Sequence, residues 1–329
     1  MLERVIHNKK VLVTGGAGFI GSNLCEELLK NENKVVCFDN FSTGKRENII
    51  ELVKNPNFIL IEGDIRNYED CQKAVKGCEI VLHQAALGSV PRSIIDPITT
   101  TDVNIGGFVK MLFAAKEEGI KRFVYAASSS TYGDHPDLPK VEEKIGNPLS
   151  PYAITKFANE LYAQNFSKIF GIETIGLRYF NVFGRRQDPN GDYAAVIPKF
   201  VKHLIDHESP VINGDGTHSR DFTYIDNVIQ INQLAAITNN KKALNQVFNV
   251  ACGENNNLNQ LLEYLKEYLT NFDGEIKYMK AIYGSERDGD VKHSLASIEK
   301  AKKILDYNPT HLFKAGLKEA IEWYWENLS

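Results

Sequence analysis

Three glycines spaced three residues apart, Gly15, Gly18 and Gly21, separate an apolar run from an amphipathic segment. The apolar run at 10–14 predicts a buried strand, and the segment at 18–30 predicts a helix. Glycines at such a junction allow a tight turn, let backbone N–H groups approach a pyrophosphate, and let the helix pack closely on the strand. The N-terminus of the helix also favours bound phosphate. This strand–loop–helix unit therefore predicts a dinucleotide site at the edge of a parallel sheet.

The first half of the chain alternates strand-like and helix-like segments. With helical patterns between them, further β-rich runs follow at 34–38, 58–61, 80–83, 122–127 and 172–177. This alternation predicts an α/β fold built on a doubly wound parallel sheet. After about residue 185, loops rich in Gly, Asp and Asn separate further predicted helices. We therefore predict a Rossmann domain at 1–185, rejoined by a strand near 245–252, and a smaller α/β substrate lobe at 186–329.

Composition narrows the classes of protein to which the chain can belong. It has 38 Lys and Arg against 42 Asp and Glu, a net charge of −4, which argues against a nucleic-acid-binding protein. No stretch approaches the ~20 apolar residues of a membrane helix. The five cysteines are an odd number without CxxC spacing, which predicts reduced thiols. His203 and His207 have helical spacing but no evident third ligand. We therefore expect a cytoplasmic protein that binds no nucleic acid, membrane or metal.

An acidic residue ends the second predicted strand. Asp39 lies 18 residues after Gly21, where a carboxylate can bind the ribose hydroxyls of an adenine dinucleotide. A carboxylate there repels a 2′-phosphate, so the pattern favours NAD over NADP. Asp64 follows the third strand and either approaches the adenine or is a solvated loop acid. The other residues that we predict to contact NAD lie in the same group of loops: Phe19, Ile20, Asn40, Ser42, Thr43, Gly44, Ile65, Gln84, Ala85 and Ala86.

A tyrosine and a lysine lie four residues apart near a predicted helix start. Ser150 is suited to cap this helix and Pro151 to its first position, which places Tyr152 and Lys156 on one face. A tyrosine with its usual pKa of about 10 is a poor base, and a neighbouring Lys⁺ lowers that pKa by stabilising the phenolate. Such pairs also occur on protein surfaces without function. The serine run at 128–130 ends the fifth predicted strand, where it meets the crevice in which such sheets bind ligands.

Six motifs occur in order along the chain: TGGAGFIG, DNFSTG, SSS-x-YG, SPYAITK, LRYFNVFG and SRDFTYIDN. Together they resemble the extended short-chain dehydrogenase/reductases, and most closely the UDP-sugar 4-epimerases, especially bacterial UDP-N-acetylglucosamine 4-epimerases. The resemblance implies that Tyr152 is the catalytic base, that Lys156 is its electrostatic partner and binds the cofactor ribose, and that Ser128 orients the substrate. Ser129 and Ser130 remain alternatives to Ser128. A tightly bound NAD, regenerated in each turnover, is also implied.

The scaffold that the sequence resembles hosts epimerases, 4,6-dehydratases and decarboxylases of nucleotide sugars. The dehydratases carry an Asp-Glu pair where this chain has Ser129 and Ser130, and the decarboxylases carry a Glu in the same stretch. Epimerisation is therefore the predicted reaction: Tyr152 removes the O4 proton, and the C4 hydride passes to NAD⁺ and returns to the other face of a transient 4-keto sugar. A noncatalytic NAD-binding protein is the alternative class, against which the Tyr–Lys pair argues. The resemblance also implies a homodimer in which helices near 98–116 and 152–170 pair.

The same resemblance implies how a UDP-sugar is bound. Ser294 matches a position that limits the sugar pocket, where a small residue leaves room for an N-acetyl group; the alternative is that Ser294 caps a helix. We therefore predict UDP-GlcNAc and UDP-GalNAc as substrates, with UDP-Glc/UDP-Gal and UDP-uronic acids as alternatives. The other implied contacts are Asn181, Arg220 and Arg287 for the pyrophosphate, Val211 and Ile212 for the uridine, and Gly88, Ser89, Ser128, Ser129 and Tyr152 for the sugar.

Overall fold

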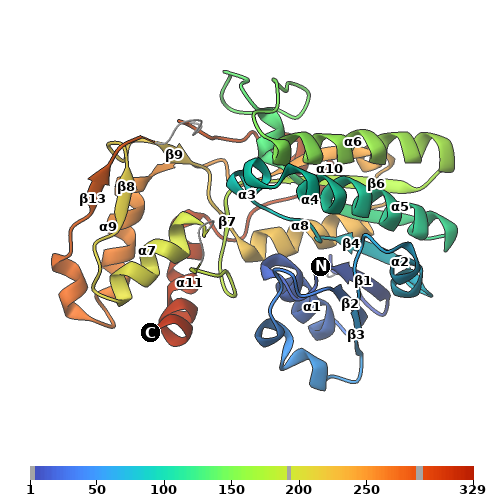
Figure 1. The fold of residues 1–329 in the computed structure, drawn as a ribbon, viewed down its shortest axis with the longest axis horizontal. Helices are drawn as coiled ribbons and strands as arrows, with labels where there is room; N and C mark the ends of the chain where they lie inside the picture. Colours follow the sequence, from blue (N-terminus) through green and yellow to red (C-terminus); the bar gives the residue numbers. More distant parts are fainter. Residues whose placement is uncertain (1–3, 191–193, 287–291) are drawn as a thin grey trace.

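The computed structural model describes residues 4–190, 194–286 and 292–329. Its central feature is a seven-stranded sheet with strand order β11-β6-β5-β4-β1-β2-β3 (Figure 1). All neighbouring strands in this sheet are parallel, and the order reverses at β1, as in doubly wound folds. The predicted fold class is therefore confirmed. The strands are β1 (Lys10–Thr14), β2 (Lys34–Asp39), β3 (Phe58–Glu62), β4 (Ile80–His83), β5 (Arg122–Ser128), β6 (Glu173–Tyr179) and β11 (Gln246–Val250).

Helices cover both faces of the sheet, which explains why its central strands are apolar throughout. Val11 and Val13 of β1 pack in one hydrophobic core, and Leu12 packs in the other, because successive side chains of a strand point to opposite faces. All three side chains are fully buried. The first core contains residues of α1 (Phe19–Lys30) and α8 (Ile225–Ile237), and the second contains residues of α2 (Tyr68–Val75), α5 (Phe108–Glu117) and α6 (Pro151–Phe170).

The helix predicted near 98–116 is present as one continuous helical stretch, but its middle turn is π-helical. A short helix α3 (Val90–Ile95) precedes α4 (Pro97–Thr101), and a π-helical segment η3 (Asp102–Gly107) joins α4 to α5. Asp96 caps α4 by accepting the Thr99 N–H at 3.0 Å. At the other end, a side-chain carbon on Gly107 would lie 2.5 Å from Ile65, so the backbone packs closely there.

A smaller lobe, at the left of Figure 1, contains mainly C-terminal elements. In it β8 (Val211–Asn213) pairs with β13 (Ile282–Gly284). Short pairs also join β7 (Val182–Phe183) to β10 (Thr223–Tyr224), and β9 (Ser219–Arg220) to β12 (Asn256–Asn257). The remaining helices are α7 (Val196–Ile205), α9 (Leu258–Leu269), α10 (Glu299–Leu305) and α11 (Phe313–Leu328), and the remaining 3₁₀ turns are η1 (Arg46–Ile49), η2 (Leu52–Lys54), η4 (Ser129–Tyr132), η5 (Lys241–Ala243) and η6 (Gly274–Tyr278).

Three C-terminal elements belong with the sheet rather than with the smaller lobe. Strand β11 pairs with β6, α8 packs against α1 and β5, and α10 packs against β11. The chain therefore returns to the sheet after residue 185, and the division at 185/186 stays a prediction. None of the helices in the described ranges has the length and apolar character needed to cross a membrane. The five cysteines are buried and form no disulfide.

Candidate functional site

A cavity of about 930 Å³ lies at the carboxyl ends of the strands. The segments that follow β1 to β5 line it, together with the start of α6 and residues of 179–195. Ligands of doubly wound sheets bind at this edge, near the point where the strand order reverses. The cavity is therefore the candidate active site.

The glycine loop between β1 and α1 has no space for side chains at its ends. A side-chain carbon on Gly21 would lie 2.0 Å from the carbonyl oxygen of Gly15. Gly15 itself has a φ of +65°, and a side-chain carbon there would lie 2.8 Å from the Ala85 nitrogen. The backbone of the loop is thus exposed to the cavity, and the N-terminus of α1 follows it. This is the arrangement that a pyrophosphate needs.

Asp39 ends β2 and is bonded to the glycine loop. One carboxylate oxygen accepts the Ala17 N–H at 2.9 Å, and the other accepts the Phe41 N–H at 2.8 Å. Burial raises the pKa of Asp39, while these backbone hydrogen bonds oppose the rise. A side-chain carbon on Gly44 would lie 2.8 Å from the carboxylate, so the loop after β2 folds closely over it. The carboxylate is therefore held in place on the cavity wall.

Asp64, after β3, is a paired acid at the cavity, and its approach to the adenine stays a prediction. Its side chain lines the cavity, and it also pairs with Arg66 at 2.7 Å and accepts a hydrogen bond from Asn40 at 2.8 Å. The hydrogen bond from Arg66 lowers its pKa to about 2, against a smaller opposing effect of burial. All the residues predicted to contact NAD line the cavity: Gly15, Gly18, Phe19, Ile20, Gly21, Asp39, Asn40, Ser42, Thr43, Gly44, Asp64, Ile65, Gln84, Ala85, Ala86, Tyr152 and Lys156.

Helix α6 begins as the sequence predicts. The Ser150 hydroxyl accepts the Ala153 N–H at 3.1 Å, and Pro151 occupies the first helical position. Tyr152 and Lys156 consequently lie on one face, and both line the cavity. The Lys156 Nζ donates a 2.9 Å hydrogen bond to the carbonyl of Ala126 at the end of β5 and lies 5.9 Å from the centre of the Tyr152 ring.

The pKa of Tyr152 differs from the sequence-based prediction. Burial raises the pKa of Tyr152, and a hydrogen bond with Ser128 lowers it in part. The Lys156 ammonium donates to the Ala126 carbonyl and lies 5.9 Å from the centre of the Tyr152 ring, so a lowering of the Tyr152 pKa by Lys156 stays a prediction. Burial also lowers the pKa of Lys156 to about 8. The protein groups alone therefore keep Tyr152 protonated at neutral pH.

The structure separates the three serines that follow β5. The Ser128 hydroxyl accepts the Ser130 N–H at 3.1 Å and the Ser130 hydroxyl at 2.9 Å, so Ser128 caps the turn η4. Ser128 and Ser129 line the cavity, whereas the Ser130 hydroxyl is directed to Ser128. Of the three, Ser128 has the hydrogen bond with Tyr152.

Comparison with known proteins identifies the family. A model of the NAD dependent epimerase/dehydratase family matches residues 11–251. The chain belongs to this family. The family prediction made from the motifs is therefore confirmed, and the chain is an enzyme of the UDP-sugar 4-epimerase group.

Solved structures of epimerases resemble the whole chain. A UDP-N-acetylglucosamine 4-epimerase from Methanobrevibacter ruminantium, in complex with UDP-N-acetylmuramic acid, is 39% identical, with a TM-score of 0.89 over 98% of this chain and 99% of that one. A UDP-glucose 4-epimerase from Thermotoga maritima, with UDP-glucose, is 35% identical, with a TM-score of 0.89 over 97% and 100%. A UDP-glucuronic acid 4-epimerase from Bacillus cereus, in complex with UDP-glucuronic acid and NAD, is 33% identical, with a TM-score of 0.87 over 96% and 99%.

NAD is the cofactor of this epimerase, as the glycine loop and Asp39 predict. The lining fits a dinucleotide, because the glycine loop presents its backbone and the N-terminus of α1 to the cavity, where a pyrophosphate can bind. The Asp39 carboxylate, which is 8% exposed, lies on the same wall. The residues that would hold the cofactor are therefore in place.

The predicted substrate residues of the epimerase fall into two groups. Gly88, Ser89, Ser128, Ser129, Tyr152 and Asn181 line the cavity. Within the described ranges, the predicted residues of the smaller lobe lie outside its lining: Val211, Ile212, Arg220 and Ser294. Arg287 lies outside the described residues. The six residues in the cavity are thus brought together with the cofactor residues, whereas Val211, Ile212, Arg220 and Ser294 are not part of its lining.

The four described residues of the smaller lobe lie in two places, two on β8 and two at β9 and the segment beside it. Ile212 is fully buried in β8, while Val211 beside it is 44% exposed. Arg220, in β9, donates hydrogen bonds to the carbonyls of Ser219 at 2.9 Å and Lys292 at 3.2 Å. The Ser294 N–H donates to the Ser219 carbonyl at 3.0 Å, which places Ser294 beside Arg220. The alternative of a helix cap is wrong, because α10 begins at Glu299 with Ile298 at its cap.

Sequence reasoning missed several residues that line the cavity of the epimerase. Lys45 and Asp188 form an ion pair at 2.7 Å, and Arg92 follows Ser89 on α3. Tyr179 donates a hydrogen bond to Gln84 at 3.1 Å. Tyr179 lies in the LRYFNVFG motif, so that motif is a usable signal, whereas the Lys45–Asp188 pair joins loops far apart in the sequence.

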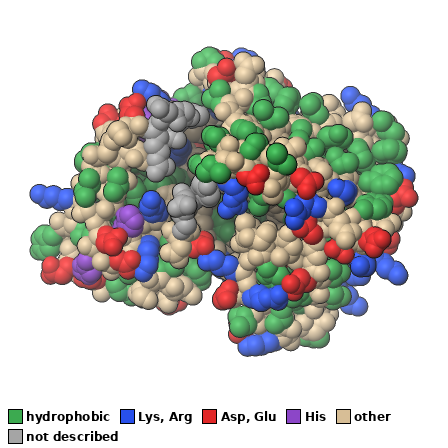
Figure 2. All heavy atoms as spheres, viewed as in Figure 1, with side chains coloured by type: hydrophobic (Ala, Val, Ile, Leu, Met, Phe, Trp, Pro, Cys, Tyr) green, Lys and Arg blue, Asp and Glu red, His purple; other side chains and the backbone are tan. Residues whose placement is uncertain are grey.

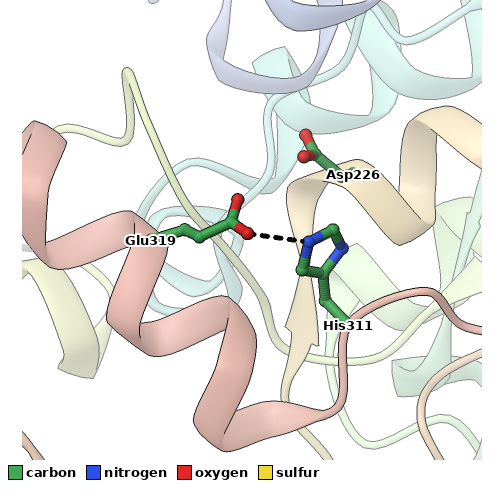
Figure 3. Close-up of side chains that lie close together, drawn as sticks. All are labelled: Asp226, His311 and Glu319. Carbon is green, nitrogen blue, oxygen red and sulfur yellow. Dashed lines mark hydrogen bonds and ion pairs between the residues drawn. The ribbon is translucent and has the colours of Figure 1, made fainter.

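A possible metal-ligand cluster lies outside the cavity lining. Asp226 on α8, His311 before α11 and Glu319 on α11 point toward one another (Figure 3). His311 shares a 3.0 Å hydrogen bond with Glu319, and Asp226 forms an ion pair with Arg185 at 2.7 Å. Each of the three groups thus has a protein partner, and the contacts join α8, α11 and the segment after β7.

Proposed function

We propose that this epimerase interconverts UDP-GlcNAc and UDP-GalNAc by inverting C4 through a transient 4-keto sugar. The observation that carries the proposal is the position of Tyr152, which lines the same cavity as Ser128 and the glycine loop. A tyrosine in this position can exchange a proton with a sugar hydroxyl next to the cofactor. The 39% identical relative, a UDP-N-acetylglucosamine 4-epimerase, and the small side chain of Ser294 support the N-acetylated sugar.

Tyr152, Ser128 and Lys156 have separate roles in the proposed reaction. Tyr152 takes the proton from the O4 hydroxyl and later returns it, with Ser128 sharing the hydrogen bond to that oxygen. Lys156 supplies a positive charge on the same helix face, and its ammonium remains fixed by the Ala126 carbonyl. NAD, held by the glycine loop and Asp39, supplies the hydride acceptor and donor. General acid–base catalysis of this kind contributes about 10²–10⁴-fold to the rate.

The residues that follow Ser128 favour epimerisation over dehydration. Ser129 and Ser130 occupy the positions where the resemblance places the acid pair of a dehydratase, and neither hydroxyl is an acid at neutral pH. The Ser130 hydroxyl is also used in the hydrogen bond to Ser128. Removal of water from C5 and C6 would need a further acid and base, so a cycle confined to C4 fits these residues better.

A second candidate substrate pair is UDP-Glc and UDP-Gal. The 35% identical relative with UDP-glucose and the 33% identical relative with UDP-glucuronic acid make these sugars, and uronic acids, the alternatives to test. In the proposal, Gly88, Ser89 and Ser129 contact the sugar. Asn181, Arg220 and Arg287 bind the pyrophosphate, and Val211 and Ile212 lie near the uridine. The substrate reaches Val211, Ile212, Arg220 and Arg287 only if the smaller lobe and the cavity together enclose it.

The test uses purified protein without added NAD. Incubation with UDP-GlcNAc is expected to give a mixture with UDP-GalNAc, and Tyr152→Phe is expected to abolish turnover while retaining NAD. Tyr162→Phe, on the same helix and 41% exposed, is the matched control and should keep its activity. Turnover of UDP-Glc or a UDP-uronic acid, without any UDP-GalNAc, would overturn the substrate assignment. A fully active Tyr152→Phe variant would overturn the mechanism.

We also propose that the enzyme is a cytoplasmic homodimer. Hydrophobic side chains gather over α3, α4 and α6 on the face shown in Figure 2. On α6, Ile154, Leu161 and Ile169 follow one another at intervals of seven and eight residues, so they form one stripe, and they are 55%, 53% and 62% exposed. A large exposed apolar face of this kind is typical of a protein interface. Buried thiols without disulfides are typical of a reducing compartment.

A further inference from the structure

A buried arginine lies behind the cavity, between the two elements that carry Ser128 and Tyr152. Arg178 is on β6, next to Ala127 of β5 in the sheet register. Its guanidinium donates hydrogen bonds of 2.8 and 2.7 Å to the two carboxylate oxygens of Glu160. Both side chains are almost completely buried, at 4% and 7% exposure. Neither of them lines the cavity, so neither touches a bound ligand there.

On one side, Arg178 holds the helix that carries the catalytic tyrosine. Glu160 lies on α6 at four and eight residues from Lys156 and Tyr152, so the three side chains share one helix face. The two hydrogen bonds to Glu160 oppose both the sliding of α6 along its axis and its rotation about that axis, relative to the sheet. A lysine in this position could supply the positive charge, but it could not donate two parallel hydrogen bonds from one planar group as the guanidinium does.

On the other side, Arg178 holds the turn that carries the serine. Tyr132 ends η4, the turn that Ser128 caps, and its ring lies 4.8 Å from the Arg178 guanidinium carbon. The Tyr132 hydroxyl donates a 2.6 Å hydrogen bond to Asn249 of β11. Tyr132 therefore contacts Arg178 through its ring and Asn249 through its hydroxyl. Arg178 also donates to the Glu142 carbonyl at 3.1 Å. The guanidinium thus contacts both sides of the Ser128–Tyr152 pair.

We propose that Arg178, with Glu160 and Tyr132, is a positioning residue that sets the distance between the Ser128 hydroxyl and the Tyr152 phenol. The proposal rests on the roles given above to Ser128 and Tyr152. A shift of α6 relative to η4 would lengthen this contact without changing the glycine loop or Asp39, which lie on other elements. Disturbing the guanidinium should therefore impair the proton transfer. NAD should still be retained through the glycine loop and Asp39, although the contact of Lys156 with the cofactor shifts with α6.

The test compares Glu160→Gln and Arg178→Lys with a change in a second ion pair, at the opposite end of β6. Arg122 of β5 and Glu173 of β6 pair at 2.9 Å at the amino ends of the strands, and neither lines the cavity. Glu173→Gln therefore removes a charge from a more exposed ion pair at the other end of the strand from Arg178. For each variant the measurements are the NAD content, KM, kcat and the pH dependence of kcat.

Glu160→Gln and Arg178→Lys are expected to retain NAD and to keep KM within about twofold, while kcat falls about tenfold or more, as small misplacements of reacting groups do. The rising limb of the pH profile should move to higher pH, because Ser128 lowers the pKa of Tyr152. Glu173→Gln should change none of these values. An unchanged kcat and pH profile in Glu160→Gln or Arg178→Lys, or an equal loss in Glu173→Gln, would overturn the positioning role.

Two further variants keep the proposal testable if a single charge change prevents folding. Tyr132→Leu removes the ring from the guanidinium and leaves the Arg178–Glu160 pair, and a lower kcat with retained NAD is the expected result. Arg178→Met with Glu160→Met replaces the buried pair by apolar side chains, which often preserves stability. If this double variant has the kcat of the wild type, the pair only stabilises the fold. Failure of the proposed function would be seen separately, as absent turnover in the wild type or full activity in Tyr152→Phe.

Discussion

The carboxylate of Asp39 accepts the backbone N–H of Ala17 at 2.9 Å, which joins the acid at the end of β2 to the glycine loop after β1. Its second oxygen accepts the Phe41 N–H at 2.8 Å. The two parts of the predicted dinucleotide motif are thus one hydrogen-bonded unit. Asp39 shapes the loop that approaches the pyrophosphate, besides presenting a negative charge to the ribose.

Asp39→Asn is expected to weaken NAD binding and to raise the affinity for NADP relative to NAD. An amide has one acceptor oxygen, so it cannot satisfy both N–H groups as the carboxylate does, and it no longer repels a 2′-phosphate. A hydrogen bond to a charged acceptor contributes about 1.5–3 kcal/mol, so the Kd for NAD should rise roughly tenfold or more. The measurement is titration of cofactor-stripped protein with NAD⁺ and NADP⁺. Glu62→Gln, opposite Asp39 on β3 and outside the cavity lining, is the control. Wild-type affinities in Asp39→Asn would contradict this account.

Gly21→Ala is expected to abolish NAD retention. The added carbon would lie 2.0 Å from the Gly15 carbonyl oxygen, so the loop and the N-terminus of α1 must move apart. Gly274→Ala is a matched control, because a side-chain carbon there meets no atom within 4 Å. The measurement is the NAD released on denaturing each purified variant. Equal NAD content in both variants would show that the close packing of the loop is not required.

The local spacing of residues was enough to predict the cofactor half of the site. Gly15, Gly21 and Asp39 follow consecutive parallel strands, and the carboxyl ends of such strands meet at one edge. The N-cap at Ser150 likewise depends on its immediate neighbours, and its hydrogen bond to Ala153 confirms it. These features required no knowledge of long-range packing.

The features that the sequence did not predict depend on burial or on contacts between distant segments. The pKa of Tyr152 rises because burial outweighs the effects of its neighbours, which i, i+4 spacing does not reveal. Lys45 and Asp188 meet across the cavity from loops far apart in the chain. The π-helical segment between α4 and α5 was not predicted either; Gly107, at its end, packs closely on Ile65, which is far away in the sequence.

Ser128→Ala is expected to move the rising limb of the pH–kcat profile to higher pH. Burial raises the pKa of Tyr152 and the hydrogen bond with Ser128 lowers it, so loss of the hydroxyl leaves the raising effect unopposed. A base with a higher pKa needs a higher pH to lose its proton, which fixes the sign of the shift. Ser130→Ala removes a hydroxyl from the same turn that is directed to Ser128 and away from the cavity lining, and it should move the limb less. A profile unchanged in Ser128→Ala would remove Ser128 from the proton transfer.

Ile98→Asp is expected to convert the proposed homodimer to a monomer. Ile98 on α4 is 82% exposed and lies on the apolar face beside α6, so a charge there is tolerated in a monomer but is desolvated in an interface. Leu161→Asp, in the middle of the α6 stripe, should have the same effect. Ile282→Asp is the control, because Ile282 is 56% exposed on β13 of the smaller lobe. Light scattering after size-exclusion chromatography gives the mass of each variant. The monomers should retain NAD, because the glycine loop and Asp39 do not lie on α4 or α6. A wild-type protein that is already monomeric, or a dimeric Ile98→Asp, would contradict the proposed interface.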